Sequence, residues 1–303
     1  MPRVSILLTC YNHLGYLPAA LDGIRNQTFQ DYEIIAIDDG STDGSREWLA
    51  AQPRIHVVLN EKNLGTYGTL NKGLDLASGE YIAVLNDDDV WMPEKLAKQV
   101  TLLDANPKVG LVHTEGEFID GKGVVFEGEP LGFKFPRFET GDILLDLVYQ
   151  NKIIASAALF RASIVKEIGG FNENYFGSGD WEMWFRIAEH YNVGCVNEKL
   201  SQYRVHGANA SHKLERIWRD DQMLREWMLP RLEDLESRFP ADRLRLAKAH
   251  CWATLGTVRM LNGDARSSRA AYRSSMHYLP GRIKNYLRFA ATYLGTKTFR
   301  KLN

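Results

Sequence analysis

The first third of the chain alternates short apolar runs with amphipathic segments. The apolar runs are rich in aliphatic residues and predict strands at Val4–Cys10, Glu33–Asp38, Ile55–Leu59, Tyr81–Leu85 and Val109–His113. Apolar positions with helical spacing predict helices at Leu14–Asn26, Thr69–Ala77 and Glu94–Asp104. Strands and helices in alternation build a parallel sheet with helices on its faces. The pattern therefore predicts an α/β fold with a mostly parallel, Rossmann-like sheet flanked by helices.

The pattern changes twice further along the chain. Residues 115–138 are rich in Gly, Pro and Phe, which is typical of a loop or small hairpin, here expected to cover the crevice of the sheet. Helix, strand and helix recur at Ile143–Gln150, Ile153–Phe160 and Trp181–Tyr191, and the pattern after Ser211 is helical throughout. We therefore expect two domains, an α/β domain over residues 1–212 and a helical C-terminal extension over residues 213–303.

Two of the predicted strands end in adjacent acidic residues. The run from Tyr81 leads straight into Asp87–Asp89, and the run from Glu33 ends in Asp38 and Asp39. Ligands of open α/β sheets bind beyond the carboxyl ends of the strands, so both acidic groups are expected at the binding edge. A hard divalent cation held by carboxylates and phosphate oxygens would offset the repulsion between three like charges. The alternative is a solvated acidic turn that caps the following helix.

Cysteine usage and the N-terminus bear on the compartment. The three cysteines, Cys10, Cys195 and Cys251, lie far apart without metal-type spacing, so neither a disulfide framework nor a zinc site is indicated. The first residues enter a strand rather than a secretory leader, and no apolar run approaches the roughly 20 residues of a membrane span. These observations predict a cytoplasmic protein.

The net charge of −1 hides a large asymmetry along the chain. Residues 1–213 contain 19 Lys and Arg against 29 Asp and Glu, whereas residues 214–303 contain 18 against 9. Residues 265–303 hold nine basic residues and no acidic one, and residues 281–299 mix basic with aliphatic and aromatic side chains. This composition suits a helix lying on an anionic surface, so we expect peripheral contact with the inner face of a membrane. The alternative is packing against the acidic part of the same chain; a nucleic acid partner is not expected.

Several ordered motifs resemble those of family 2 glycosyltransferases with the GT-A fold. The nucleotide-binding start of that family is similar to Val4–Asn12, Gln27–Phe29 and Ile37–Asp43. The resemblance extends through Asn63–Gly65, Gly79–Ile82, the acidic cluster, Pro93, Gly170–Phe171, Gly179–Glu182 and Tyr203–His206. It covers about the first 210 residues and not the helical remainder.

The resemblance implies that Thr9, Tyr11 and Asp39 hold the base of a nucleotide. Tyr11 offers a ring face for stacking, and Asp39 can accept a hydrogen bond from the N3 hydrogen of uracil or thymine. This favours a UDP-sugar or dTDP-sugar donor over a GDP-sugar. Taken without the other motifs, Tyr11 would merely mark the end of a strand.

The metal motif of the family usually begins with Asp and reads Asp, any residue, Asp. The aligned window here is Asn86–Asp88, in which the first acid is replaced, and a window shifted by one residue restores the pattern. The resemblance implies that Asp88, or alternatively Asp89, binds Mg²⁺ or Mn²⁺, with Asp87 next to the substrate. Arg204 and His206 would share one face of a strand, where a cation and an imidazole suit a diphosphate or its metal. Arg204 is thus a candidate substrate-binding residue and His206 a candidate metal ligand.

Asp180 precedes a predicted helix and follows a glycine-rich approach. In the family this position is the general base, which takes the proton from the acceptor hydroxyl; the alternative role is the helix N-cap. Glu182 is a weaker candidate for orienting the acceptor.

Together these residues predict an inverting glycosyltransferase that moves a sugar from a nucleotide diphosphate to a hydroxyl acceptor. The expected acceptor is a glycan or lipid-linked glycan of cell-surface polysaccharide or lipopolysaccharide synthesis. One alternative is a sugar-phosphate nucleotidyltransferase, but the loop from Thr9 to Gly15 lacks the several glycines and the Arg that would grip a triphosphate. The other is a non-catalytic module that binds nucleotide sugars.

Overall fold

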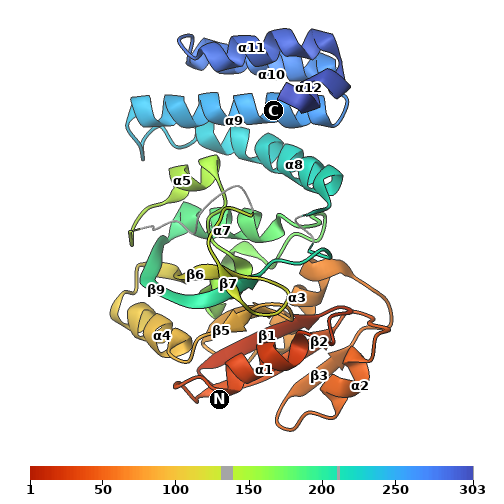
Figure 1. Cartoon of the computed structure of the whole chain (residues 1–303). Coiled ribbons are helices and arrows are strands. Elements are labelled where there is room, and N and C mark those ends of the chain that lie inside the picture. Colours follow the sequence, from red (N-terminus) through yellow and green to blue (C-terminus); the bar gives the residue numbers. More distant parts are fainter. Residues whose placement is uncertain (131–138, 210–211, 303) are drawn as a thin grey trace. The chain divides into compact units, whose positions relative to one another are not determined.

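The computed structural model describes residues 1–130, 139–209 and 212–302 (Figure 1). The chain divides into two compact units: the first comprises Met1–Ile143 and Lys152–Asn209, and the second comprises Leu144–Asn151 and Ala210–Asn303. The short helix near residue 146, which the sequence pattern placed in the α/β domain, thus groups with the C-terminal helices. The reason is local packing: the Arg225 guanidinium donates to the carbonyl oxygen of Val148, and the Tyr149 ring lies 4.7 Å from that of His250.

One half of the sheet in the first unit is parallel throughout. Its strands run in the order β3-β2-β1-β4 and are β1 (Val4–Cys10), β2 (Tyr32–Asp38), β3 (His56–Leu59) and β4 (Tyr81–Asn86). Strand β1 is buried along its whole length because helices cover both faces of the sheet. The predicted strands match these bounds to within a residue. Strands β1 and β4 are buried along nearly their whole length and are therefore mostly apolar, whereas β3 is only partly buried.

The other half of the sheet is mixed. It continues as β8-β6-β9-β5, with β7 on the edge of β6; the strands are β5 (Val90–Trp91), β6 (Val109–Ile119), β7 (Val125–Phe126), β8 (Leu159–Arg161) and β9 (Asn192–Arg204). Strand β6 continues six residues beyond the predicted end because it pairs with β9 through register shifts that place polar residues inside. The expected hairpin after residue 115 is the β6–β7 pair, and residues 131–138 lie outside the described residues.

The segment predicted as a strand at 153–160 is mostly not one. It holds the 3₁₀ turn η1 (Ala155–Ala157) followed by the short β8. Ser156 explains the difference, since its hydroxyl accepts from the Asn86 amide at 3.1 Å and its carbonyl accepts from the Trp91 indole at 2.6 Å. Ser156 therefore fixes Asn86 and Trp91, which lie before and after the acidic cluster Asp87–Asp89.

The helices of the first unit pack on the sheet around an aliphatic core that contains Ile6, Leu8 and Leu85. They are α1 (Leu17–Arg25), α2 (Ser45–Ala50), α3 (Gly65–Leu76), α4 (Lys95–Ala105), α6 (Ala162–Ile168) and α7 (Gly179–His190).

The second unit is helical. Its elements are α5 (Leu144–Tyr149), α8 (Leu214–Glu233), α9 (Ala241–Leu261), α10 (Ala265–Tyr278), α11 (Ile283–Ala291), η3 (Thr292–Leu294) and α12 (Thr296–Leu302). Helices α9 and α10 approach closely at Gly256. A Cβ atom at this position would lie 3.1 Å from the Tyr272 ring, so the absence of a side chain allows the contact. Within the part of the chain that the structure describes, no helix is both long and apolar enough to cross a membrane.

Acid should destabilise the first unit through a buried histidine. His113 in β6 is 2% exposed, and burial lowers the pKa of its imidazole to about 4 from an ordinary value of about 6.5. Between these values the unfolded chain binds a proton that the folded chain does not. The neutral His113 therefore does not lower the free energy of unfolding above about pH 6.5. As the pH falls to about 4, the free energy of unfolding drops by roughly 3 kcal/mol.

The variant His113→Gln tests this origin of the pH dependence. We expect its thermal unfolding temperature to fall less than that of the wild type between about pH 6.5 and about pH 4. Equal slopes for the two proteins in differential scanning calorimetry would assign the acid sensitivity to other groups.

Candidate active site

The loops that follow β1 and β2 are joined by hydrogen bonds. Asn12 lies in the left-handed region with φ 57°, a conformation that Asn tolerates better than most residues. Its amide donates to the Ser41 hydroxyl at 2.9 Å, and its side-chain oxygen accepts from the Thr42 amide at 2.7 Å. The Leu14 amide donates to Asp43 at 2.9 Å. Two parallel strand ends are thereby joined into one edge.

Asp39, a predicted base-binding residue, also orders the loop before α3. Its Oδ1 accepts from the Leu64 amide at 2.8 Å and from the Asn60 side chain at 2.9 Å, and its Oδ2 accepts from the Gly65 amide at 3.0 Å. The residue is 4% exposed. Oδ2 accepts a single described bond, so it retains acceptor capacity for a ligand.

Thr9 and Tyr11, the other predicted base-binding residues, lie at the end of β1. Thr9 is the register partner of Asn86 in β4 and is largely buried, at 8% exposed. Tyr11 is 46% exposed, which is unusual for a large ring and leaves a face open for stacking. The structure thus brings Thr9 and Tyr11 to the edge that also carries Asp39.

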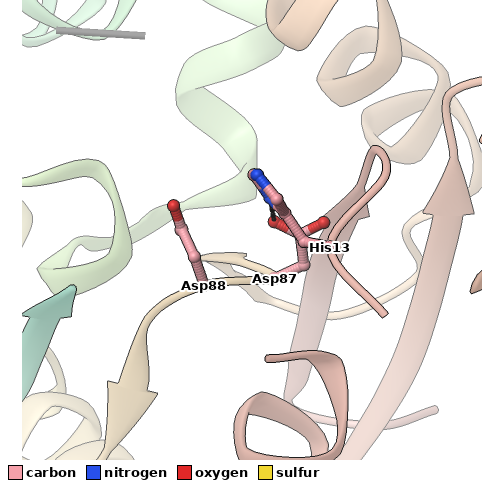
Figure 2. A group of neighbouring side chains, drawn as sticks. All are labelled: His13, Asp87 and Asp88. Carbon is pink, nitrogen blue, oxygen red and sulfur yellow. Dashed lines mark hydrogen bonds and ion pairs between the residues drawn. The ribbon is translucent and has the colours of Figure 1, made fainter. Parts of the chain in front are cut away.

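His13, Asp87 and Asp88 form a cluster suited to a cation (Figure 2). One ligand atom from each lies within 4.8 Å of the other two. Asp87 accepts from the Tyr11 amide at 2.8 Å, and its other oxygen lies 2.9 Å from Nδ1 of His13. Burial raises the pKa of Asp87, and the hydrogen bond to Asp87 raises the pKa of His13. Two carboxylates and an imidazole are a donor set that fits Mn²⁺ or Mg²⁺ better than a thiophilic metal.

Asp89 lies outside this cluster. It is 1% exposed, its Oδ1 accepts from the Arg204 amide at 3.0 Å, and its Oδ2 accepts from the Ser156 hydroxyl. Burial is the main cause that raises the pKa of Asp89 well above the ordinary value. Of the two alternatives from the sequence, the geometry favours Asp88 as the metal ligand and gives Asp89 a role in holding β9.

Arg204 and His206 do not share a strand face as predicted, because β9 ends at Arg204. Arg204 is 4% exposed; its Nε donates to the Asp88 carbonyl at 2.7 Å and its Nη1 to the Asp120 carbonyl at 3.0 Å. Its guanidinium also lies 4.8 Å from the Tyr16 ring centroid. These contacts hold the backbone of Asp88, and direct contact of Arg204 with a diphosphate stays a prediction.

His206 contacts the acidic cluster from the other side. Its Nε2 lies 3.0 Å from Oδ2 of Asp88, and its ring meets that of His13 edge-on with centroids 5.1 Å apart. His13 was not among the sequence candidates. Its signal was modest: it was the single basic residue in the loop from Thr9 to Gly15. Only the pairing of β1 with β4 brings that loop beside Asp87.

Asp180 lies in the first turn of α7, which begins at Gly179 and has Ser178 at its N-cap position. Ser178 makes no side-chain cap bond, whereas Oδ1 of Asp180 accepts from the Trp181 amide at 2.7 Å, so the Asp180 carboxylate also contacts the first turn of the helix. A Cβ at Gly179 would lie 2.7 Å from the Tyr67 ring, so glycine is needed where the chain enters the helix. Glu182 is 3% exposed, with its oxygens 2.8 and 2.9 Å from Arg186 nitrogens, a pairing that stabilises α7 and leaves little surface for an acceptor.

Comparison with known proteins identifies the family of the chain. The family model for glycosyl transferase family 2 matches residues 5–169, more than half of the chain. The chain belongs to glycosyl transferase family 2. An uncharacterized glycosyltransferase from Haemophilus influenzae is 30% identical to this transferase over 228 residues, which cover 69% of the chain and 68% of the relative. One from Methanocaldococcus jannaschii is 28% identical over 223 residues, covering 71% and 74%.

Solved structures resemble this family 2 glycosyltransferase in fold. Residues 1–349 of TarS from S. aureus align with a TM-score of 0.65 and 16% identity over 98% of this chain and 89% of that one. The mannosyltransferase PcManGT from Pyrobaculum calidifontis, in complex with GDP-Man and Mn²⁺, aligns with a TM-score of 0.58 and 20% identity over 93% and 75%. At these identities the likeness concerns the fold alone. The predictions of the family, of the GT-A type of α/β fold and of a transferase enzyme are confirmed.

Proposed function

We propose that this protein is an inverting, metal-dependent glycosyltransferase that uses a UDP-sugar or dTDP-sugar. The observation that carries the proposal is the convergence of Tyr11, Asp39 and the His13–Asp87–Asp88 cluster on one edge of the sheet. A ring face, a carboxylate acceptor and a cation-binding group correspond to the base, its polar edge and the diphosphate of a nucleotide sugar. The family match argues against a nucleotidyltransferase or a non-catalytic module.

The choice of nucleotide rests on Asp39. A uracil or thymine N3–H is a donor that the remaining acceptor capacity of Oδ2 can receive. Among the similar structures, TarS is solved with UDP and with UDP-GlcNAc, and PcManGT with GDP-Man. The neighbours thus include both nucleotide classes. Guanine N1–H also donates to carboxylates, so the pyrimidine donor is part of the proposal and the comparison of donors below decides it.

The cation would be held by Asp88 with Asp87 and His13, and His206 would orient Asp88 through its hydrogen bond. When bound, Mn²⁺ or Mg²⁺ neutralises charge on the diphosphate as it leaves. Arg204 keeps the Asp88 backbone in place, because its Nε donates a hydrogen bond to the Asp88 carbonyl oxygen.

The catalytic base would be Asp180. Its carboxylate takes the proton of the acceptor hydroxyl as that oxygen forms a bond to the anomeric carbon, and the bond to the nucleotide diphosphate breaks on the opposite side. This single displacement inverts the anomeric centre. The acceptor is a hydroxyl of a glycan or a lipid-linked glycan in cell-surface polysaccharide or lipopolysaccharide synthesis, carried out on the cytoplasmic side of the membrane.

A panel of nucleotide sugars, each with Mn²⁺ and with EDTA, tests the donor and the metal together. We expect UDP-sugars or dTDP-sugars with Mn²⁺ to stabilise the fold by about 2.7 kcal/mol at a ligand concentration 100-fold above Kd, because a ligand of the native state stabilises by mass action. Thermal unfolding measures the effect. Stabilisation by GDP-sugars alone would overturn the assignment of Asp39, and equal shifts with EDTA would overturn the metal.

A further inference from the structure

Helix α11 and the turn η3 expose large apolar side chains. Ile283, Leu287 and Leu294 are 73%, 67% and 62% exposed, and the neighbouring Tyr286 and Tyr293 are 46% and 63% exposed. Residues 283 and 287 are one helical turn apart and 286 lies beside them, so they occupy one stripe of α11. A contiguous exposed apolar stripe in a water-soluble unit marks an interaction surface more often than an accident of composition. We call these five residues the α11 stripe.

The orientation of the helix is set by polar contacts on its inner side. Asn285 is 1% exposed and donates to the Ser275 hydroxyl of α10 at 2.7 Å. Thr292 is 2% exposed and donates to the Phe289 carbonyl at 2.7 Å. An amphipathic helix of a globular protein ordinarily turns its apolar face inward. Here the buried side of α11 holds Asn285 together with Ala291 and the partly buried Phe289, while the residues of the stripe stay outside, so their exposure follows from the packing of the second unit.

The surroundings of the α11 stripe are basic. Lys284 is exposed in α11 and Lys297 is exposed in α12, and Arg282 and Arg288 at the start and end of α11 are partly exposed. Residues 265–303 contain no acidic residue that could neutralise them. In addition, Arg269 of α10 lies over the Tyr293 ring at 4.6 Å, which adds a cation at the edge of the stripe. Aliphatic and tyrosine side chains framed by Lys and Arg are the composition of helices that lie in the headgroup region of anionic bilayers.

We propose that the α11 stripe and its basic frame dock on an anionic lipid surface. The aliphatic side chains enter the boundary between headgroups and acyl chains, the two tyrosines lie at the headgroup level, and the Lys and Arg side chains pair with lipid phosphates. A second copy of the chain is a poorer occupant, because two such surfaces would bring basic residues face to face without an intervening acid. The docking is independent of the proposed donor chemistry.

Co-sedimentation of the full chain with lipid vesicles tests the proposal. The vesicles contain phosphatidylcholine alone or with about one third phosphatidylserine, and each basic residue near such a surface contributes roughly fivefold to binding. We expect binding to the anionic vesicles at least tenfold tighter than to the neutral ones, and weaker in high salt. Lys284→Glu/Lys297→Glu should lose at least tenfold, and Ile283→Gln/Leu287→Gln should lose a similar amount.

A matched control carries the same change of charge elsewhere. Lys122→Glu/Lys166→Glu reverses two exposed lysines of the first unit and should bind like the wild type. All altered side chains are exposed, so unfolding temperatures should agree, and calorimetry of UDP binding reports separately on the nucleotide site. Equal binding to neutral and anionic vesicles, or loss in the control as large as in the test variant, would overturn the proposal. A dimer in light scattering that the Ile283→Gln/Leu287→Gln variant abolishes would replace the lipid surface with a second copy.

Discussion

Replacing Asp88 with Ala should abolish the effect of Mn²⁺ on UDP binding and slow sugar transfer by roughly 10³-fold or more. A metal that neutralises a departing diphosphate supplies several kcal/mol, and about 1.4 kcal/mol corresponds to a tenfold change in rate. Asp88 is the part-exposed carboxylate of the cluster, and its side chain contacts His206 and Asn209 rather than the core. The fold should therefore survive the substitution. Titration calorimetry with Mn²⁺ and with EDTA measures the first effect, and single-turnover kinetics the second.

The matched control is Asp75→Ala, which removes an exposed acid of α3 outside the cluster. It should bind UDP and transfer sugar as the wild type does. If Asp88→Ala kept a metal-dependent affinity for UDP, Asp87 and His13 would have to be the residues that bind the metal. The variant Asp89→Ala should differ in kind, because it removes the partner of Ser156 and of the Arg204 amide and thereby lowers stability.

Replacing Asp180 with Asn should reduce transfer by about 10²-fold or more while leaving the affinity for UDP within about twofold, because a general base acts on the acceptor and not on the nucleotide. The side-chain oxygen of Asn can still accept from the Trp181 amide, as Oδ1 of Asp180 does at 2.7 Å, so the start of α7 should be preserved. The side-chain volume is almost unchanged. Rates at saturating donor, together with calorimetry of UDP, separate the two effects.

Two comparisons make this result decisive. Asp75→Asn carries the same chemical change on an exposed acid and should be neutral. Glu182→Gln should behave differently from Asp180→Asn, because Glu182 is buried against Arg186 and its loss affects stability before chemistry. Turnover like that of the wild type in Asp180→Asn would mean that another group accepts the proton.

Much of the sheet and part of the site follow from local sequence. Strands β1 and β4 were predicted closely because a parallel strand covered on both faces needs a mostly apolar run, which is visible without any tertiary information. The same logic placed Asp39 and Asp88 at one edge, since parallel strands end on the same side. Family motifs around Tyr11 and Asp180 then supplied the expected chemistry.

Long-range pairing decided the rest, because it depends on partners far apart in the sequence. The sequence shows Arg204 only as a cation near the predicted site, and long-range packing buries it against the Asp88 and Asp120 carbonyl oxygens. Asp89 looks equivalent to Asp88 in the sequence, but in the structure its carboxylate accepts a hydrogen bond from the Ser156 hydroxyl. His13 joins the cluster because β1 and β4 are neighbours.

The C-terminal helices show the same division between composition and structure. The sequence alone determined that residues 265–303 are basic and lack acids. This charge indicates an anionic partner but does not show which surface would bind it. Which face of α11 meets solvent was decided by tertiary contacts: the buried Asn285 bonds to Ser275 of the neighbouring helix, and Ala291 and Phe289 pack into the core of the second unit. An isolated helix can turn either face outward, and a polar side chain that must keep its hydrogen bond in the interior settles the rotation.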